Sequence, residues 1–141
     1  MDSRAEAYSD KCKENLEVSD WAQGEGHCNA AASRYYYALR QAALAYFERI
    51  EERPPESVWK GGRKVPNKKG DWPHGYLIKT VDRRLSKTLE AGAWLRRARD
   101  LREKADYKTE GVEPHELPEL RRHTDELLRA LGYEMDNERE G

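Results

Sequence analysis

The residues of this chain that most readily bind a metal or move a proton near neutral pH are four histidines and two cysteines. Cys12, His27 and Cys28 supply three possible zinc ligands, but their spacing matches no common zinc site and no fourth ligand accompanies them. In a reducing compartment, two such sparse cysteines are more typical of small buried residues than of a disulfide. We therefore expect no metal and no other cofactor.

Arg102, Asp106 and Tyr107 form a second group whose spacing has a chemical meaning. Positions i and i+4 lie on one face of a helix, so Arg102 and Asp106 can form an ion pair there. Tyr107 could then cap a helical bundle by bonding to a neighbouring helix. The same side chains could instead form a polar binding surface, and the spacing alone leaves both interpretations open.

The formal net charge of −1 conceals an uneven distribution of charge along the chain. Residues 56–87 contain nine bases and three acids, whereas residues 110–141 contain four bases and ten acids. The basic block could attract phosphates or an acidic partner, or it could be an ordinary solvated loop and helix face. No apolar run is long enough for a signal peptide or a membrane span, so we expect a cytoplasmic protein without membrane contact.

The elements that must position these residues are helices. A chain of 141 residues is the usual size of one domain, and 38% charged residues with a mean hydropathy of −1.11 favour amphipathic helices over buried sheets. The pattern predicts an all-α, up-and-down bundle of four to five helices over residues 1–133, followed by a polar tail over 134–141. The five predicted helices begin near Ala5, Asn29, Asp71, Trp94 and Pro114. No alternating pattern is long enough to predict a sheet.

The helix that begins near Asn29 carries the strongest periodicity. One apolar stripe contains Tyr36, Leu39, Ala43, Tyr46 and Ile50, and a second stripe of mostly small residues contains Ala31, Tyr35, Ala38, Ala42 and Ala45. This helix should be central, and its alanines permit close approach by a neighbouring helix or another subunit. We expect a homodimer through the alanine stripe, at Ala38 and Ala42. Residues 51–71, which follow, predict a long basic loop.

Three segments resemble the HEPN domains, in particular the branch encoded beside minimal nucleotidyltransferases. The segment 33–39, Ser-Arg-Tyr-Tyr-Tyr-Ala-Leu, resembles the signature of the second helix, and 102–107 resembles the Arg-x-x-x-Asp-Tyr element late in the bundle. Residues 74–78 resemble the start of the third helix. The resemblance covers residues 7–131 and implies a helical bundle, a dimer and a nucleotidyltransferase partner in a toxin-antitoxin or defence system.

Catalytic HEPN ribonucleases use an Arg-x(4 to 6)-His motif, in which the imidazole moves a proton and the guanidinium holds the phosphate. This chain has no arginine at that spacing before any of its histidines. The nearest match places Lys69 five residues before His74, in a loop, and lysine lacks the two-pronged contact of arginine. Lys69 and His74 are therefore weak catalytic candidates, and His74 is better explained as a helix-start residue hydrogen-bonded to the bundle.

The resemblance implies a nucleotide-binding or partner-binding surface made of Arg34, Tyr37, Arg102, Asp106 and Tyr107. Tyr107 could accept a nucleotide from the partner enzyme, with Asp106 taking the phenolic proton. We expect a non-catalytic or weakly catalytic module that binds nucleotide or nucleic acid. The alternatives are a metal-independent endoribonuclease toxin, for which RNA would be the substrate, and a purely structural helical adaptor.

Overall fold

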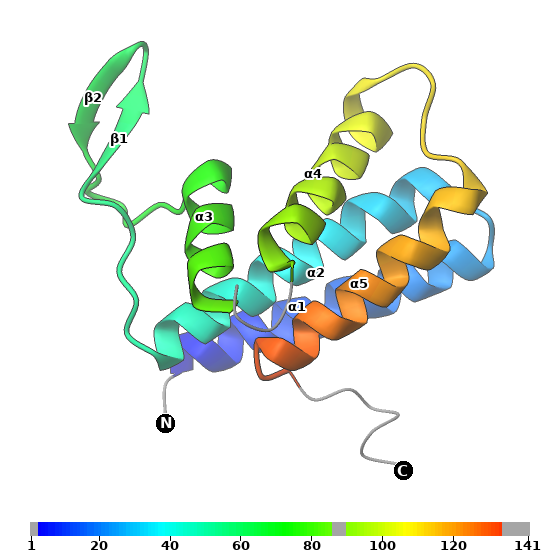
Figure 1. The fold of residues 1–141 in the computed structure, drawn as a ribbon, viewed down its shortest axis with the longest axis horizontal. Helices are drawn as coiled ribbons and strands as arrows, with labels where there is room; N and C mark the ends of the chain where they lie inside the picture. The colour runs from blue at the N-terminus through cyan, green and yellow to red at the C-terminus, as the bar shows by residue number, and fades with distance from the viewer. Residues whose placement is uncertain (1–2, 86–89, 134–141) are drawn as a thin grey trace.

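The computed structural model describes residues 3–85 and 90–133, and over these residues the chain is mostly helical, as predicted. Its elements in order are α1 (Ser3–Gly24), α2 (Cys28–Arg49), β1 (Ser57–Lys60), β2 (Arg63–Pro66), α3 (His74–Leu85), α4 (Ala91–Tyr107), the 3₁₀ turn η1 (Pro114–Glu116) and α5 (Leu117–Ala130). Helices α1 and α2 pack along their whole lengths, and α4 and α5 pack on α2 (Figure 1). The fold is therefore a bundle around α2, whose central place was predicted.

The alanine stripe of α2 is buried within the single chain, and so are Tyr36, Leu39 and Ala43 of the other stripe, whereas Tyr46 and Ile50 are half-buried. Ala31, Ala38, Ala42 and Ala45 are exposed by 3% or less, because α1 and the other helices of the same chain cover them. The prediction that this stripe forms a dimer interface is wrong, since Ala38 and Ala42 have no free surface to offer a partner. The alanines instead allow the helices of one chain to approach closely.

The segment predicted as a loop without strands contains a β-hairpin, which corrects the all-α expectation. Strands β1 and β2 pair antiparallel, with Val58 opposite Val65 and Trp59 opposite Lys64. The two-residue connection Gly61–Gly62 has positive φ at both positions, 58° and 76°, which is the geometry of a type I′ turn. Each strand is only four residues long, too short for an alternating pattern to be recognised in the sequence.

Two anchors fix the segment that joins α2 to α3. The side chain of Asn67 donates to the carbonyls of Pro55 and Asp71, at 2.7 and 3.0 Å, and accepts from the amide of Asp71, at 3.0 Å. The ring of Trp72 stacks on Phe47 of α2, with 4.4 Å between the centroids. The hairpin therefore projects from the bundle on a fixed base (Figure 1).

The junction between α3 and α4 depends on Gly92. The backbone amide of Gly92, in the first turn of α4, donates to the carboxylate of Asp82 in α3, at 3.0 Å. A Cβ at position 92 would lie 2.6 Å from Asp82 Cγ, so only glycine fits under this cap. The apolar pattern of residues 77–89 predicts that the third helix continues to Leu89, which lies outside the described residues.

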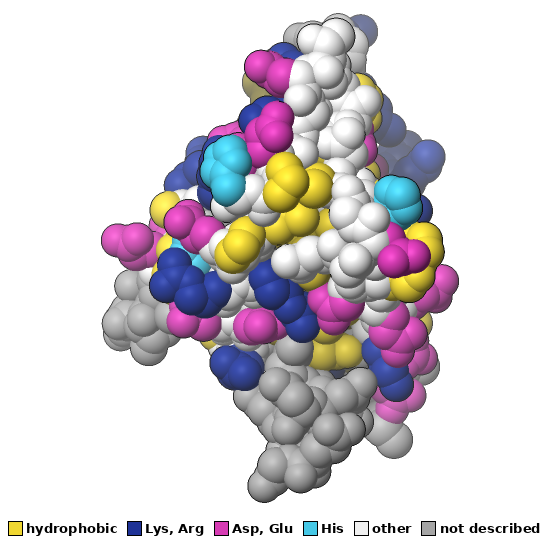
Figure 2. Space-filling view, turned by 90° about the vertical axis from the view of Figure 1, so that its right-hand side faces the viewer, with side chains coloured by type: hydrophobic (Ala, Val, Ile, Leu, Met, Phe, Trp, Pro, Cys, Tyr) yellow, Lys and Arg dark blue, Asp and Glu magenta, His cyan; other side chains and the backbone are white. Residues whose placement is uncertain are grey.

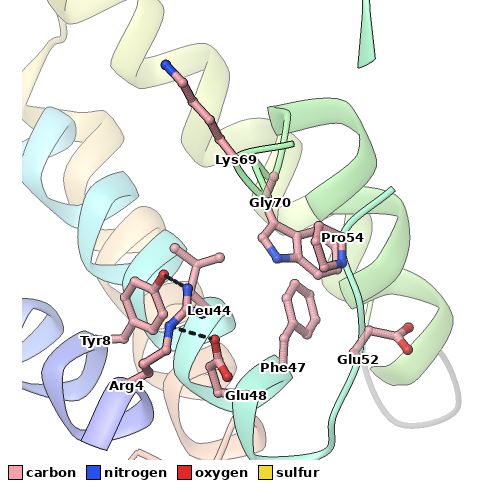
Figure 3. A pocket seen from close by; sticks show the side chains of 10 residues that line it. Arg4, Tyr8, Leu44, Phe47, Glu48, Glu52, Pro54, Lys69 and Gly70 are labelled. Carbon is pink, nitrogen blue, oxygen red and sulfur yellow. Dashed lines mark hydrogen bonds and ion pairs between the residues drawn. The ribbon is translucent and has the colours of Figure 1, made fainter. Parts of the chain in front are cut away.

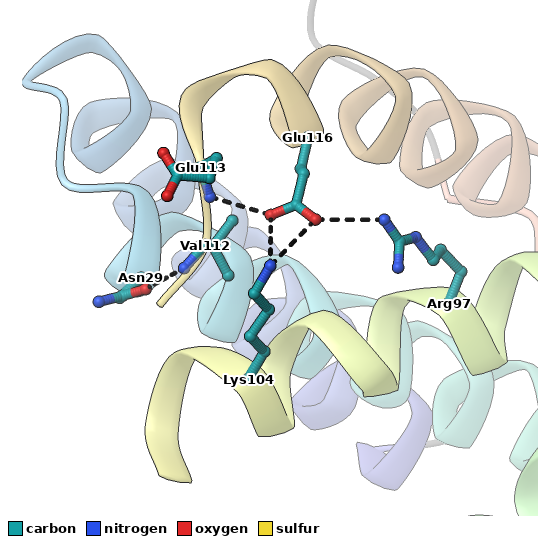
Figure 4. A network of polar contacts seen from close by, with 6 residues as sticks. All are labelled: Asn29, Arg97, Lys104, Val112, Glu113 and Glu116. Carbon is teal, nitrogen blue, oxygen red and sulfur yellow. Dashed lines mark hydrogen bonds and ion pairs between the residues drawn. The ribbon is translucent and has the colours of Figure 1, made fainter. Parts of the chain in front are cut away.

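The turn between α4 and α5 is held by Glu116. Its carboxylate accepts from the backbone amide of Glu113 at 2.9 Å, from Lys104 at 3.3 Å and from Arg97 at 3.3 Å (Figure 4). Proximity to these donors lowers the pKa of Glu116, so the carboxylate stays ionised at neutral pH. These contacts fix α4 against η1, while Gly132, with φ of 87°, follows the end of α5.

The described residues bear on three features that the sequence analysis considered: a membrane span, the two cysteines and a metal site. No helix there is both long and apolar enough to cross a membrane. Cys12 is buried and Cys28 half-buried, and both are free thiols. Burial raises the pKa of Cys12 to about 12, so its thiol is unreactive at neutral pH. Within residues 3–85 and 90–133, no group of three or more histidine, cysteine or acidic side chains could hold a metal ion.

Candidate functional site

The three consecutive tyrosines of α2 point in three directions, because neighbouring residues on a helix are about 100° apart. The hydroxyl of Tyr35 turns toward α1 and donates to Asp20. Tyr36 turns toward the start of α3, and Tyr37 accepts a hydrogen bond of 2.7 Å from Arg102 of α4. Tyr36 and Tyr37 thus bring α2, α3 and α4 together around one polar region.

His74, the first residue of α3, is hydrogen-bonded through Nδ1 to the hydroxyl of Tyr36. Burial raises the pKa of Tyr36 against the effect of nearby arginines, so the phenol keeps its proton at neutral pH. We assign Tyr36 as the donor, which leaves Nδ1 as the acceptor and places the ring proton on Nε2. The expectation that His74 is bonded to the bundle at a helix start is confirmed.

Three arginines surround this pair of side chains. Burial lowers the pKa of His74 to about 4, and the positive charges of Arg40, Arg99 and Arg102 act in the same direction. The imidazole is therefore neutral at pH 7, with Nε2 as a neutral donor. We call these five residues, His74, Tyr36, Arg40, Arg99 and Arg102, the arginine–histidine cluster.

The three guanidinium groups of the cluster are not equally neutralised. Arg102 lies 3.3 Å from Asp106 and Arg99 lies 3.4 Å from Glu103, both as i,i+4 pairs on α4. Arg40 instead donates through Nη2 to the carbonyl of Trp72 at 2.8 Å and also interacts with the hydroxyl of Tyr36, while its buried Nη1 meets no acceptor in good hydrogen-bond geometry among the described residues. No carboxylate of the described chain pairs with Arg40. A half-buried cation with an unused donor favours an anionic ligand.

Space beside the cluster lies between α3 and α4. A cavity of about 200 Å³ is lined by Gly75, Ile78, Lys79, Arg96, Arg99 and Asp100. Arg99 belongs both to the cavity and to the cluster, and Lys79 and Arg96 add further positive charge. Three of the side chains that line the cavity are basic and one, Asp100, is acidic, so its charge suits a phosphate group better than a large apolar ligand.

The predicted surface is assembled in part. Tyr37, Arg102 and Asp106 do lie together, and the expected ion pair between Arg102 and Asp106 is confirmed. Tyr107 is 71% exposed with its ring 5.3 Å from the Arg102 guanidinium, so the expectation that it caps the bundle on a neighbouring helix is wrong. Arg34 points elsewhere and donates to Asn15 of α1 at 3.3 Å.

Sequence reasoning missed four residues of this region, namely Tyr36, Arg40, Arg99 and Glu103, as site residues. A helical-face argument could have found them, because Tyr36 and Arg40 are four residues apart on α2. Arg99, Arg102 and Glu103 likewise share one face of α4. What the spacing could not show is that α3 presents His74 at the same place.

Lys69 and His74 do not form a joint site. Lys69 follows the hairpin and lines a different pocket, of about 110 Å³, together with Phe47, Pro54 and Trp72 (Figure 3). In Figure 3 its side chain extends away from the other residues of this pocket. His74 instead contacts Tyr36. Lys69 and His74 therefore have different neighbours, and the structure does not bring this motif together.

No protein-family model, no curated protein and no solved structure matches this chain.

Proposed function

We propose that this chain is a HEPN-like helical module that binds the phosphate of a nucleotide or nucleic acid at the arginine–histidine cluster. The observation that carries the proposal is Arg40, a half-buried guanidinium with an unused donor and no carboxylate partner among the described residues. A phosphate would supply the missing acceptors, and arginine matches its geometry with two parallel donors. The motifs of residues 33–39 and 102–107 support the HEPN-like part of the proposal.

The cluster is suited to binding more than to cleavage. At neutral pH the imidazole of His74, whose pKa is about 4, has no proton on Nδ1 to give to a leaving group and is a weak base. The acidic side chains of Glu103 and Asp106 also oppose the approach of a second phosphate. A well-matched acid or base contributes about 100-fold to 10,000-fold in rate, so we expect RNA cleavage to be absent or feeble.

The binding proposal is tested by titration calorimetry with AMP and with inorganic phosphate. Arg40→Gln should abolish measurable binding or weaken it at least about tenfold, which corresponds to about 1.4 kcal/mol. Arg34→Gln is the matched control, because it removes the same charge from the same helix outside the cluster. Equal binding by wild type and Arg40→Gln would contradict the proposal.

The cleavage part is tested by incubating the protein with structured and single-stranded RNA in EDTA. Robust cleavage that His74→Ala abolishes would favour the alternative of a metal-independent endoribonuclease. No nucleotide binding at all, together with no cleavage, would favour a structural adaptor.

The resemblance extends the proposal to a minimal nucleotidyltransferase partner in a toxin-antitoxin or defence system, with this module acting in the cytoplasm as a homodimer.

Tyr107 is an exposed phenol beside Asp106 and is our proposed acceptor of a nucleotidyl group from the partner enzyme. Its oxygen would attack the α-phosphorus of a nucleoside triphosphate, pyrophosphate would leave, and Asp106 would take the proton. Intact-mass measurement after incubation with such an enzyme and ATP should show an added nucleotidyl group that Tyr107→Phe lacks. Sedimentation at tens of micromolar tests the dimer, whose interface must lie outside the alanine stripe.

A further inference from the structure

The hairpin of β1 and β2 and the segment that follows it carry basic side chains without acidic ones. Residues 57–70 contain five bases and no acid: Lys60, Arg63, Lys64, Lys68 and Lys69. All five are exposed, and no described carboxylate forms an ion pair with any of them. On the opposite side of the molecule, by contrast, acidic and basic side chains alternate around a small apolar patch (Figure 2).

An aromatic ring lies on this basic surface. Trp59 is 72% exposed, the largest exposure among the large hydrophobic side chains that the structure describes. Strand alternation places Trp59 and its cross-strand partner Lys64 on one face, and Val58 and Val65 on the other. Val58 is buried at 8% exposure, so the hairpin turns its valine face inward and its tryptophan face to solvent. The packing of the protein core therefore does not explain why a tryptophan occupies position 59.

The backbone that carries this ring is held in place at both ends of the hairpin. The Gly61–Gly62 turn closes the tip, and the amide of Asn67 donates to the carbonyl of Glu56 at 2.8 Å to close the base. The side chain of Asn67 ties that base to Pro55 and Asp71. Because the backbone of the hairpin is already ordered, little conformational entropy of the backbone is lost when a ligand stacks on the indole ring.

We propose that the hairpin is a second binding site, for a single-stranded polynucleotide, in which a base stacks on Trp59 while Lys64 on the same face contacts a phosphate. Lys60 and Arg63, which strand alternation places on the other face at the tip, add to the positive charge that attracts the strand. The two observations are complementary, since a polyanion accounts for the positive charge and an unpaired base accounts for the open indole face. An acidic peptide would satisfy the charge but would leave the indole unexplained. This inference does not rest on the proposed function of the arginine–histidine cluster.

The test measures fluorescence anisotropy of labelled oligo(U) and oligo(dT) with the full chain. Trp59→Ala should weaken binding by about 5-fold to 100-fold, the usual effect of losing one stacked base, and Trp59→Phe should restore much of it. Trp21→Ala is the matched control, because Trp21 is an indole of α1 that is also exposed, by 61%. Its affinity should equal that of wild type.

A second set of measurements tests how much the positive charge of the hairpin contributes to binding. Lys64→Gln should weaken binding and reduce the slope of log K against log salt by about 0.7, whereas Lys11→Gln, on an exposed position of α1, should leave both unchanged. Failure to bind either oligonucleotide would overturn the proposal. So would binding that depends on Lys64 but not on Trp59 and that polyglutamate displaces equally well, because this is the behaviour of an acidic protein partner.

The two sites can be told apart. Trp59→Ala should leave AMP binding at the cluster unchanged, whereas Arg40→Gln should remove AMP binding and leave the stacking contribution of Trp59 intact. Loss of AMP binding in Trp59→Ala would contradict the independence of the hairpin. Thermal melts of all variants show whether each has folded.

Discussion

The arginine–histidine cluster and the hairpin are both basic, yet they hold their charges in opposite ways. In the cluster, two of three guanidinium groups are paired with carboxylates, and the nearby imidazole is kept neutral by burial and by those same cations. In the hairpin and the segment that follows it, five basic side chains are exposed and none has an ion-pair partner among the described residues. A buried site must balance its charges because desolvation is costly, whereas an exposed one can stay unbalanced. We therefore expect a selective site in the first region and a salt-sensitive one in the second.

The largest expected effect concerns the helix that supports the cluster. Ala38→Glu should unfold the protein or cost about 4 kcal/mol or more, because it buries an unpaired charge at a fully covered position. Chemical denaturation measures this loss. A folded variant that merely changes from dimer to monomer would restore the interpretation of the alanine stripe as a subunit interface. Ala30→Glu, at an exposed position of the same helix, is the control.

Gly92→Ala should destabilise the protein by about 1 to 3 kcal/mol, because the new Cβ would displace the Asp82 carboxylate that caps α4. Gly75→Ala is the control in the first turn of α3, where a Cβ added to the glycine would have no other atom within 4 Å. Its free energy of unfolding should match that of wild type or rise slightly. Equal stability of the two variants would show that this cap does not hold α3 against α4.

These two predictions also show where sequence reasoning succeeded and where it could not. The helical periodicity of α2 predicted its central place, since a helix that is apolar over more than half of its circumference must be covered on several sides. The same pattern could not show whether Ala38 faces another helix of the chain or another chain. The cap on Gly92 depends on a carboxylate ten residues earlier in the sequence, which only the packing of two helices brings close.

In the candidate site, too, contacts within one helix could be predicted from the sequence and contacts between elements could not. The pairing of Arg102 with Asp106 is local to one helix and was predicted from spacing. Arg34 was assigned to the same surface, but it lies on the side of α2 that faces α1. The contact between Tyr36 and His74 joins residues 38 positions apart and has no local signal. The hairpin was missed because its strands are short.

A smaller effect concerns pH. The pKa of His74 falls from 6.5 to about 4 on folding, so the unfolded chain binds more protons between these values. This contribution to stability is fully present above pH 6.5 and is lost as the pH falls toward 4. After allowance for partial exposure of the ring, it amounts to about 1 to 2 kcal/mol. His74→Gln should flatten this part of the stability profile, and an unchanged profile would contradict the burial of a neutral imidazole.

The smallest expected effect is that of Trp59→Ala on folding. The side chain is exposed by 72%, so the free energy of unfolding should change by less than about 0.5 kcal/mol. Val58→Ala, on the inward face of the same strand, should cost more because it removes buried apolar surface. Thermal melts of the two variants compare the faces of the hairpin, and a larger loss for Trp59→Ala would give that ring a structural role.

The central claim, that the cluster takes a phosphate, is tested most directly by following the imidazole of His74 by NMR during titration with AMP at pH 7. We expect the His74 resonances to shift in a saturable manner and the pKa of His74 to rise above about 4, because a bound phosphate offsets the charges of the three arginines. The shift should be lost in Arg40→Gln and kept in Arg34→Gln. Resonances of His74 that do not move with AMP, in a folded protein, would contradict the account.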